Sequence, residues 1–139
     1  MTEANDWNAN VIKEFRENGG KVSGMFEGFP MILLHTTGAK SGKARIIPLV
    51  YLADGDRVFV FASKGGADDN PDWYHNLLAY PEIEAEIGTE RFAATAVVLQ
   101  GAERDEYYAK QVALLPNFGD YERKTKRVIP VVELRRSAA

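Results

Sequence analysis

The 139-residue chain contains no cysteine and only two histidines. Without cysteine it can form no disulfide, no thiolate metal site and no thiol nucleophile. His35 and His75 do not form a His-x-x-x-His pair, so we expect no metal site. No apolar run reaches the length of a membrane span, and the first residues lack the basic and apolar regions of a secretory signal. These absences predict a cytoplasmic protein with no stable membrane anchor.

The composition is that of one globular domain, which we expect to span residues 1–139. Hydrophobic residues make up 45% of the chain and charged residues 27%, a balance typical of proteins with a single core. The formal net charge is −3, yet residues 38–64 carry five basic side chains against two acidic ones. A local basic excess in an acidic chain suits a small anionic ligand, whereas long nucleic acid usually requires a broad basic surface. We therefore expect a small-molecule partner and no nucleic acid.

Hydrophobic periodicity predicts a helix followed by strands. Residues 1–20 read as an amphipathic helix whose apolar positions fall on one stripe: Trp7, Val11, Ile12 and Phe15. Runs rich in β-branched and aromatic residues predict strands over 31–37, 45–53 and 57–63. The Asp54-Gly55 pair predicts a hairpin between the last two, and Pro48 indicates a bulge or an edge position.

The second half of the chain continues this mixture of helices and strands. Residues 71–80 read as a short helix with Asn70 as N-cap and Pro71 at its first position. Residues 82–88, 91–100 and 128–136 read as strands, residues 101–116 as a helix, and residues 116–127 as a loop or helical turn. Six strands and two or three helices, with no repeated βαβ unit, predict an α+β fold around a small closed or half-closed barrel.

Two glycine-containing loops are the candidate binding elements. The first, TTGAKSGKAR over residues 36–45, is one residue short of a P-loop, and Ala44 stands where Ser or Thr would be needed. No GxGxxG occurs, so a Rossmann dinucleotide site is not expected either. The second, SKGGA over residues 63–67, precedes a helix and offers backbone N–H groups to an anion. From the residues alone, an anion site and a pair of solvated turns are about equally supported.

Four segments resemble a known family: LLHTTGAKSGKARIIPLVYL, FASKGGADDNPDWYHNL, YPEIEAEIG and LPNFGDYERKTKRVIPVVEL. In this order they are similar to the deazaflavin-dependent nitroreductase family, oxidoreductases that use coenzyme F420. The resemblance covers Met31 to Leu134 and implies a split β-barrel of the flavin-reductase-like type. The cofactor-binding barrel would span residues 31–134, and the helix at residues 1–20 would be the variable part.

The resemblance also implies how the cofactor is held. Coenzyme F420 combines a flat deazaflavin ring with a phosphodiester and an oligoglutamate tail. Lys40 and Arg45 would hold the phosphate and tail, with Lys43 as an auxiliary contact. Pro48 would shape the ring pocket and Trp73 would pack near the cofactor. Backbone N–H groups would line the ring and phosphate at Ser63, Lys64, Gly65, Gly66 and Ala67.

The implied reaction passes a hydride from reduced F420 to a conjugated acceptor, such as an activated alkene, enone, quinone or nitro-aromatic compound. Family tyrosines that contact the substrate correspond here to Leu115, Phe118 and Tyr121. Only Tyr121 keeps the hydroxyl, so it is the candidate catalytic residue, and the acceptor is expected to be more apolar than a nitroimidazole. A flavin mononucleotide oxidoreductase and a non-catalytic F420 carrier remain as alternatives, and the protein would be a monomer or homodimer.

Overall fold

The computed structural model describes residues 3–22 and 29–136. These residues form six strands, four α-helices and one 3₁₀ helix, and in chain order the elements are α1 (Glu3–Glu17), β1 (Met31–Thr37), β2 (Ala44–Asp54), β3 (Arg57–Phe61), η2 (Lys64–Gly66), α2 (Asp72–Ala79), β4 (Glu82–Ile87), β5 (Glu90–Val98), α3 (Gly101–Leu114), α4 (Asn117–Lys124) and β6 (Val131–Arg136).

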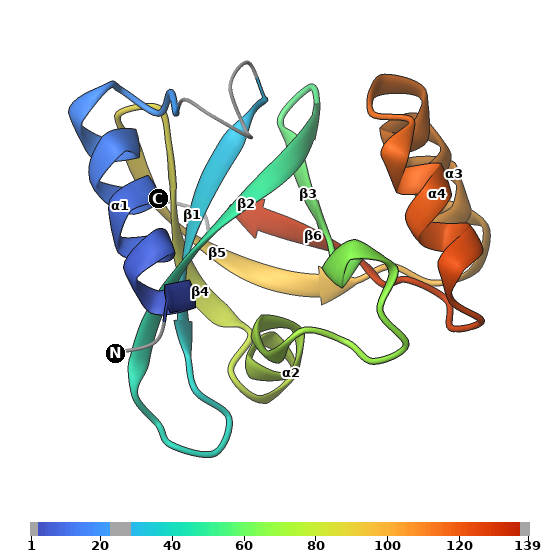
Figure 1. Ribbon diagram of the computed structural model, residues 1–139, viewed down its shortest axis with the longest axis horizontal. Helices are drawn as coiled ribbons and strands as arrows, with labels where there is room; N and C mark the ends of the chain where they lie inside the picture. Colours follow the sequence, from blue (N-terminus) through green and yellow to red (C-terminus); the bar gives the residue numbers. More distant parts are fainter. Residues whose placement is uncertain (1–2, 23–28, 137–139) are drawn as a thin grey trace.

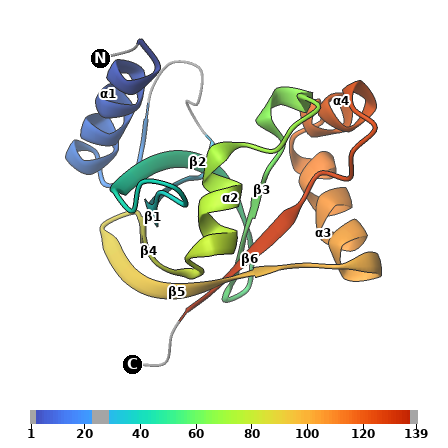
Figure 2. The same ribbon diagram turned by 90° about the horizontal axis from the view of Figure 1, so that it is seen from below.

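The strands close into a barrel in the order β1-β2-β3-β6-β5-β4, and every pairing is antiparallel. The predicted α+β split barrel is therefore confirmed. α1 covers one side of the barrel, and α3 and α4 lie together on the opposite side (Figure 1). α2 crosses the lower end (Figure 2), where Trp73 and Leu77 join the cluster of apolar side chains inside the barrel.

A tight hairpin sets the register of β2 and β3. Asp54 pairs with Arg57 around a two-residue turn, and Gly55 has φ +61°, as the first position of such a turn favours. This confirms the predicted hairpin. Pro48 lies opposite Leu33 in an unbroken register, at a point where β2 does not yet pair with β3. Proline can occupy this position because its missing N–H faces an unpaired side, so the edge prediction is confirmed and there is no bulge.

Two helix predictions need correction. α2 begins at Asp72 with Pro71 as N-cap, so the assignment of Asn70 as cap is wrong. The Asn70 side chain instead accepts a hydrogen bond of 2.7 Å from Arg127, a residue far along the chain. Most of residues 116–127, predicted as a loop or helical turn, forms α4, because Phe118 packs against α3 and its carbonyl accepts the Tyr108 hydroxyl at 2.7 Å.

The predicted N-terminal helix is present as α1. Phe15 is buried between α1 and β1, in an apolar cluster that also contains Met31 and Leu33 of β1. Val11 and Ile12 pack against this cluster. The side chain of Trp7, the first position of the predicted stripe, lies outside the described part of the chain.

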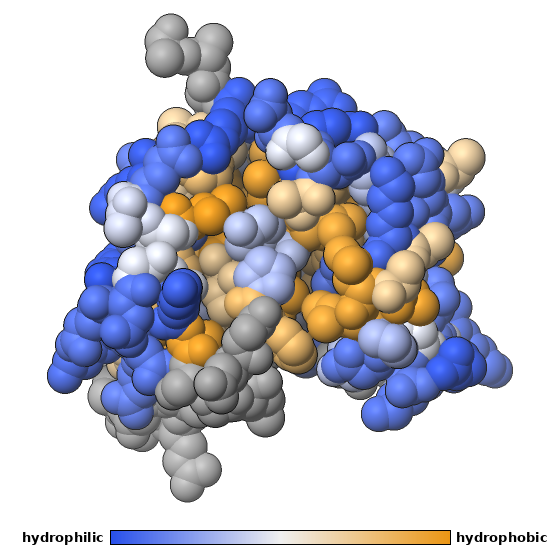
Figure 3. Space-filling model, turned by 90° about the horizontal axis from the view of Figure 1, so that it is seen from above, coloured by the Kyte–Doolittle hydropathy of each residue, from blue (hydrophilic) through white to orange (hydrophobic). Residues whose placement is uncertain are grey.

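The outer face of β2 lies between the helices on the two sides of the barrel. Ile47, Leu49 and Tyr51 contact the cluster inside the barrel, so the alternate residues of β2 face outward. Of these, Val50 packs with the α1 cluster and Leu52 with the cluster of α3 and α4. Figure 3 shows apolar side chains gathered in a hollow of the upper face, with a polar rim around it.

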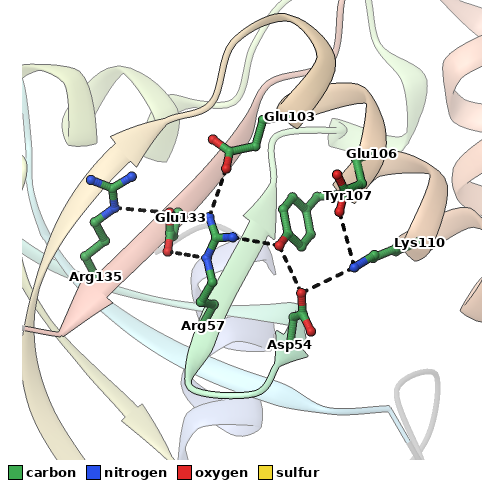
Figure 4. Close-up of polar contacts among 8 residues, drawn as sticks. All are labelled: Asp54, Arg57, Glu103, Glu106, Tyr107, Lys110, Glu133 and Arg135. Carbon is green, nitrogen blue, oxygen red and sulfur yellow. Dashed lines mark hydrogen bonds and ion pairs between the residues drawn. The ribbon is translucent and has the colours of Figure 1, made fainter.

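A polar network fixes the β2–β3 turn to α3 (Figure 4). Arg57 donates two hydrogen bonds to Glu133, at 2.9 and 3.0 Å, and one of 2.7 Å to the Tyr107 hydroxyl. Tyr107 in turn donates to Asp54 at 2.9 Å, and its ring stacks on Phe59 at 4.0 Å between centroids. These bonds lower the pKa of Asp54 and of Glu133, so both carboxylates are charged at neutral pH. Arg57 is one of the five basic residues within residues 38–64, and its hydrogen bonds in this network show that it has a structural role.

Candidate cofactor site

The first loop, residues 38–43, joins β1 to β2 in an ordered turn. The Gly38 N–H donates to the Lys43 carbonyl and the Gly42 N–H to the Gly38 carbonyl, each at 2.9 Å, and Ser41 Oγ accepts the Lys43 N–H at 3.2 Å. A Cβ at position 38 would lie 2.5 Å from Ser41 Oγ, so a larger residue there would displace the hydroxyl that bonds Lys43. The turn therefore presents Lys40 from a defined backbone.

Asn76 of α2 holds this loop from the side. Its Oδ1 accepts the Ala39 N–H at 2.9 Å, and the residue is only 8% exposed. A buried amide that bonds a loop backbone fixes the loop against the helix, because breaking the bond leaves a polar group unpaired. Asn76 is thus a site residue that was not predicted from the sequence.

The cations of the first loop have no partners among the described residues. Lys40, Lys43 and Arg45 are exposed and make no ion pair with the side chains described within residues 9–22 and 29–136. In contrast, Arg57 and Arg136 each bind carboxylates within the protein. Free cations on an ordered loop fit an anionic ligand.

Two adjoining cavities place these cations beside α2. Lys40 and Arg45 line a cavity of about 360 Å³ together with Asp72 and Asn76. A second cavity of about 540 Å³ shares Arg45, Asp72 and Asn76 and extends to Trp73 and to α1. The structure therefore brings together Lys40, Arg45 and Trp73, three of the predicted cofactor residues.

The second loop forms the short helix η2. Within it, the Gly66 N–H donates to the Ser63 carbonyl at 2.9 Å and the Ala67 N–H to the Lys64 carbonyl at 3.2 Å. Those two N–H groups are therefore already used inside the turn, and Gly65 precedes both. The N–H groups of Ser63 and Lys64 have no hydrogen-bond partner in the described part of the chain. Of the predicted N–H donors, these two are the ones placed to reach a ligand.

Arg127 holds the second loop from behind. Its guanidinium donates to the carbonyls of Ala67, Ala62 and Ser63 at 2.8, 3.1 and 2.9 Å, and to Asn70 Oδ1 at 2.7 Å. This residue was not predicted from the sequence, since nothing in its local sequence points to a loop 60 positions earlier. It is the main polar contact between the second loop and the segment before β6.

The predicted acceptor residues lie on or beside α4, next to the second loop. A Cβ at Gly66 would meet the Tyr121 carbonyl at 2.9 Å, so loop and helix are in close contact. Phe118 is 8% exposed and packs edge-on against Phe61 and Tyr121, at 5.8 and 5.2 Å between centroids. The Tyr121 hydroxyl, half-buried, accepts a hydrogen bond of 3.1 Å from Asn117. Leu115 packs on the same cluster and is partly exposed.

The predicted residues thus form two groups on opposite sides of α2 (Figures 1 and 2). One group comprises the first loop with Trp73, and the other comprises η2 with α4. Pro48 is buried on the outer face of β2. A ligand that used both groups would need an anionic end and a flat apolar end.

The fold and these two groups define a class: a split barrel with free cations and free N–H groups for an anion, and apolar side chains of α4 beside η2 for a ring. The donor set fits coenzyme F420, which joins a flat ring to a phosphodiester and an acidic tail. In the described residues, no helix is long and apolar enough to cross a membrane.

Comparison with known proteins identifies the family. The family described as F420H(2)-dependent quinone reductase matches residues 7–135. The F420H(2)-dependent quinone reductase Rv1261c of Mycobacterium tuberculosis (strain ATCC 25618 / H37Rv) is 40% identical over 126 residues, which cover 88% of this chain and 85% of that protein. The chain therefore belongs to the F420H(2)-dependent quinone reductase family, and it is an oxidoreductase whose cofactor is coenzyme F420.

Solved structures agree with this assignment. An F420-H2 dependent reductase (FDR-A) superposes with a TM-score of 0.70 at 37% identity, covering 76% of this chain and 94% of that one. A structure described as a domain-swapped dimer gives a TM-score of 0.72 at 33% identity, covering 96% and 100%. The predicted fold, enzyme class and cofactor are confirmed.

Proposed function

We propose that the protein transfers a hydride from reduced coenzyme F420 to a quinone-type acceptor. The observation that carries this proposal is the set of free cations, Lys40 and Arg45, on a loop fixed beside Trp73. An acidic protein has little use for exposed, unpaired cations on a rigid turn unless they meet an anion. The names of the family and of the similar proteins support the choice of acceptor.

In this proposal the two groups of residues share one cofactor. Lys40 and Arg45 bind its phosphate and acidic tail through charge-assisted hydrogen bonds, with Lys43 as an auxiliary contact. The N–H groups of Ser63 and Lys64 bind an oxygen of the cofactor, while Gly65, Gly66 and Ala67 shape the turn. Pro48, on the outer face of β2, lies against the ring. The bound cofactor supplies a hydride, and the protein positions it and excludes water.

The acceptor site is proposed at α4. Leu115 and Phe118 provide apolar contacts for a flat ring, and Tyr121 provides a hydroxyl to orient one acceptor oxygen. Reduction of a quinone takes up one hydride and one proton and yields the hydroquinone, and the proton comes from water or from the Tyr121 hydroxyl. A nitro-aromatic acceptor would meet fewer polar groups here, because Leu115 and Phe118 carry none.

Titration of the cofactor-free protein with F420 and with flavin mononucleotide tests the proposal. We expect F420 to bind more tightly than the flavin, and its affinity to fall with added salt because the contacts are ionic. Lys40→Ala and Arg45→Ala should each weaken F420 binding by about 1.5–3 kcal/mol, roughly one to two decades in Kd.

Lys21→Ala is the matched control, because it removes an exposed lysine outside both groups of site residues. Its Kd for F420 should equal that of the wild type. Unchanged affinity in both loop variants would remove the support for the first loop as the anion site.

A further inference from the structure

Arg127 is a partly buried arginine that bonds only neutral groups among the described residues. Its acceptors are three backbone carbonyls of residues 62–67 and the side-chain amide of Asn70. An arginine normally meets a carboxylate or phosphate in its rigid fork. Here the guanidinium instead donates hydrogen bonds to backbone carbonyls of the second loop.

We propose that Arg127 is a positioning residue that turns the N–H groups of the second loop toward the cofactor. The proposal rests on the function proposed above, because it assigns the second loop to F420. It extends that function to a residue in the segment before β6, outside both groups of predicted site residues.

Peptide geometry gives the direction of the effect. In a trans peptide the C=O of one residue and the N–H of the next point in opposite directions. Arg127 binds the carbonyls of Ala62 and Ser63, so the N–H groups of Ser63 and Lys64 point away from it. These are the same two N–H groups that have no partner in the described part of the chain. One side chain therefore accounts for the orientation of both free donors.

The backbone of the loop requires such support. Lys64 has φ +47° and is the one non-glycine residue with positive φ in the part of the chain that the structure describes. This conformation is unfavourable for a lysine and persists where surrounding contacts hold it. The Lys64 ammonium is bound to Asp69 at 3.1 Å, which leaves its backbone N–H to serve a ligand.

The positive charge of Arg127 also favours binding of an anionic group at the free N–H groups of Ser63 and Lys64. Because its acceptors are neutral, its positive charge is not cancelled by a direct ion pair with the side chains described within residues 9–22 and 29–136. It lies behind the loop and raises the potential at the N–H groups in front. Geometry and charge can be separated by experiment, since lysine keeps the charge and loses the planar fork.

The test compares Arg127→Lys and Arg127→Ala with a matched control, Lys126→Ala, which removes an exposed neighbouring lysine. Amide NMR spectra of the ligand-free proteins report on the loop, and titration with F420 gives the Kd. We expect both Arg127 variants to shift the amide signals of residues 63–68 and to raise the Kd at least tenfold. Lys126→Ala should do neither, and urea unfolding shows whether each variant is folded.

A second ligand, the deazaflavin nucleoside without phosphate and tail, locates the contact on the cofactor. A loss of affinity confined to F420 places the phosphate at the N–H groups, and a loss shared by both ligands places a ring oxygen there. Either result supports Arg127 as a positioning residue.

Wild-type affinity for F420 in a folded Arg127→Lys variant, with unchanged loop amide signals, would overturn the proposal. A wild-type protein that does not bind F420 would instead overturn the proposed function. In that case the ligand-free amide spectra still decide whether Arg127 orders the loop.

Discussion

Gln111 of α3 is a buried polar residue whose amide nitrogen has no hydrogen-bond partner among the described residues. The residue is 1% exposed, so the amide N–H groups lose their hydrogen bonds to water and gain none in the protein, which lowers the stability of the fold. Methionine has a similar length and no polar hydrogen. We expect Gln111→Met to raise the free energy of unfolding by about 1–2 kcal/mol, measured by urea denaturation.

The isosteric variant Gln111→Glu is the control, because it buries a carboxylate at the same place and should destabilise the protein. A Met variant less stable than the wild type would show that the amide makes a bond essential to the fold.

Tyr121 allows binding and turnover to be separated. Its hydroxyl is proposed to orient the acceptor, and it does not belong to the residues proposed to hold the cofactor. Tyr121→Phe keeps the ring packing on Phe118 and removes the hydroxyl. We expect the turnover of a soluble quinone to fall about 10–100-fold while the Kd for F420 stays unchanged. An equal loss in both quantities would assign the residue to cofactor binding or to the fold.

The site residues differ in how far the sequence could predict them. Lys40 and Arg45 were predicted because their charges stand in a short glycine-containing loop, a local pattern. Asn76 and Arg127 act on backbone groups 37 and 60 positions away. Such contacts depend on how α2 and the segment before β6 fold back onto the loops, so no local pattern reveals them.

α1 is attached to the barrel through a charged contact. Arg16 donates to Glu86 of β4 at 2.8 Å, and Glu86 also meets the His35 ring at 2.5 Å. The Arg16 guanidinium, with the His35 contact, lowers the pKa of Glu86 from 4.5 to about 2. Because the folded pKa is lowered, the stabilisation is fully present above pH 4.5 and is lost as the pH falls toward about 2.

We therefore expect Glu86→Gln to be less stable than the wild type at neutral pH, and the difference to shrink between pH 4.5 and about 2. Urea unfolding of both proteins across this range measures the difference. A constant difference would show that Glu86 acts through packing and not through its charge.

At the level of elements, the sequence predicted those with strong local signals. The β2–β3 hairpin followed from Asp54-Gly55, and the strands followed from alternation or apolar runs. α4 was missed because its sequence, NFGDYERK, is polar and contains glycine, so its helical form depends on the burial of Phe118 and Gly119. The Asn70 cap was wrong because a long-range partner, Arg127, competes for the same side-chain oxygen.

The closed barrel depends on pairings between distant strands. β1 pairs with β4, and β3 with β6, across long stretches of chain. A sequence can predict antiparallel neighbours joined by short turns, but closure depends on non-local contacts. The number of strands made a barrel the best prediction, and the resemblance to a family specified which barrel.

Closure also places the two cofactor loops on either side of α2, so a ligand that touches both should stabilise the whole fold. A ligand that binds only the folded state stabilises it by RT ln(1 + [L]/Kd), about 2.7 kcal/mol at one hundred times Kd. For a chain of 139 residues this corresponds to a rise in Tm of roughly 10 °C. We expect this rise with F420, a smaller one with flavin mononucleotide at the same concentration, and little with F420 added to Lys40→Ala. Differential scanning fluorimetry measures all three, and an equal rise with both ligands would contradict the assignment of the first loop to the acidic part of F420.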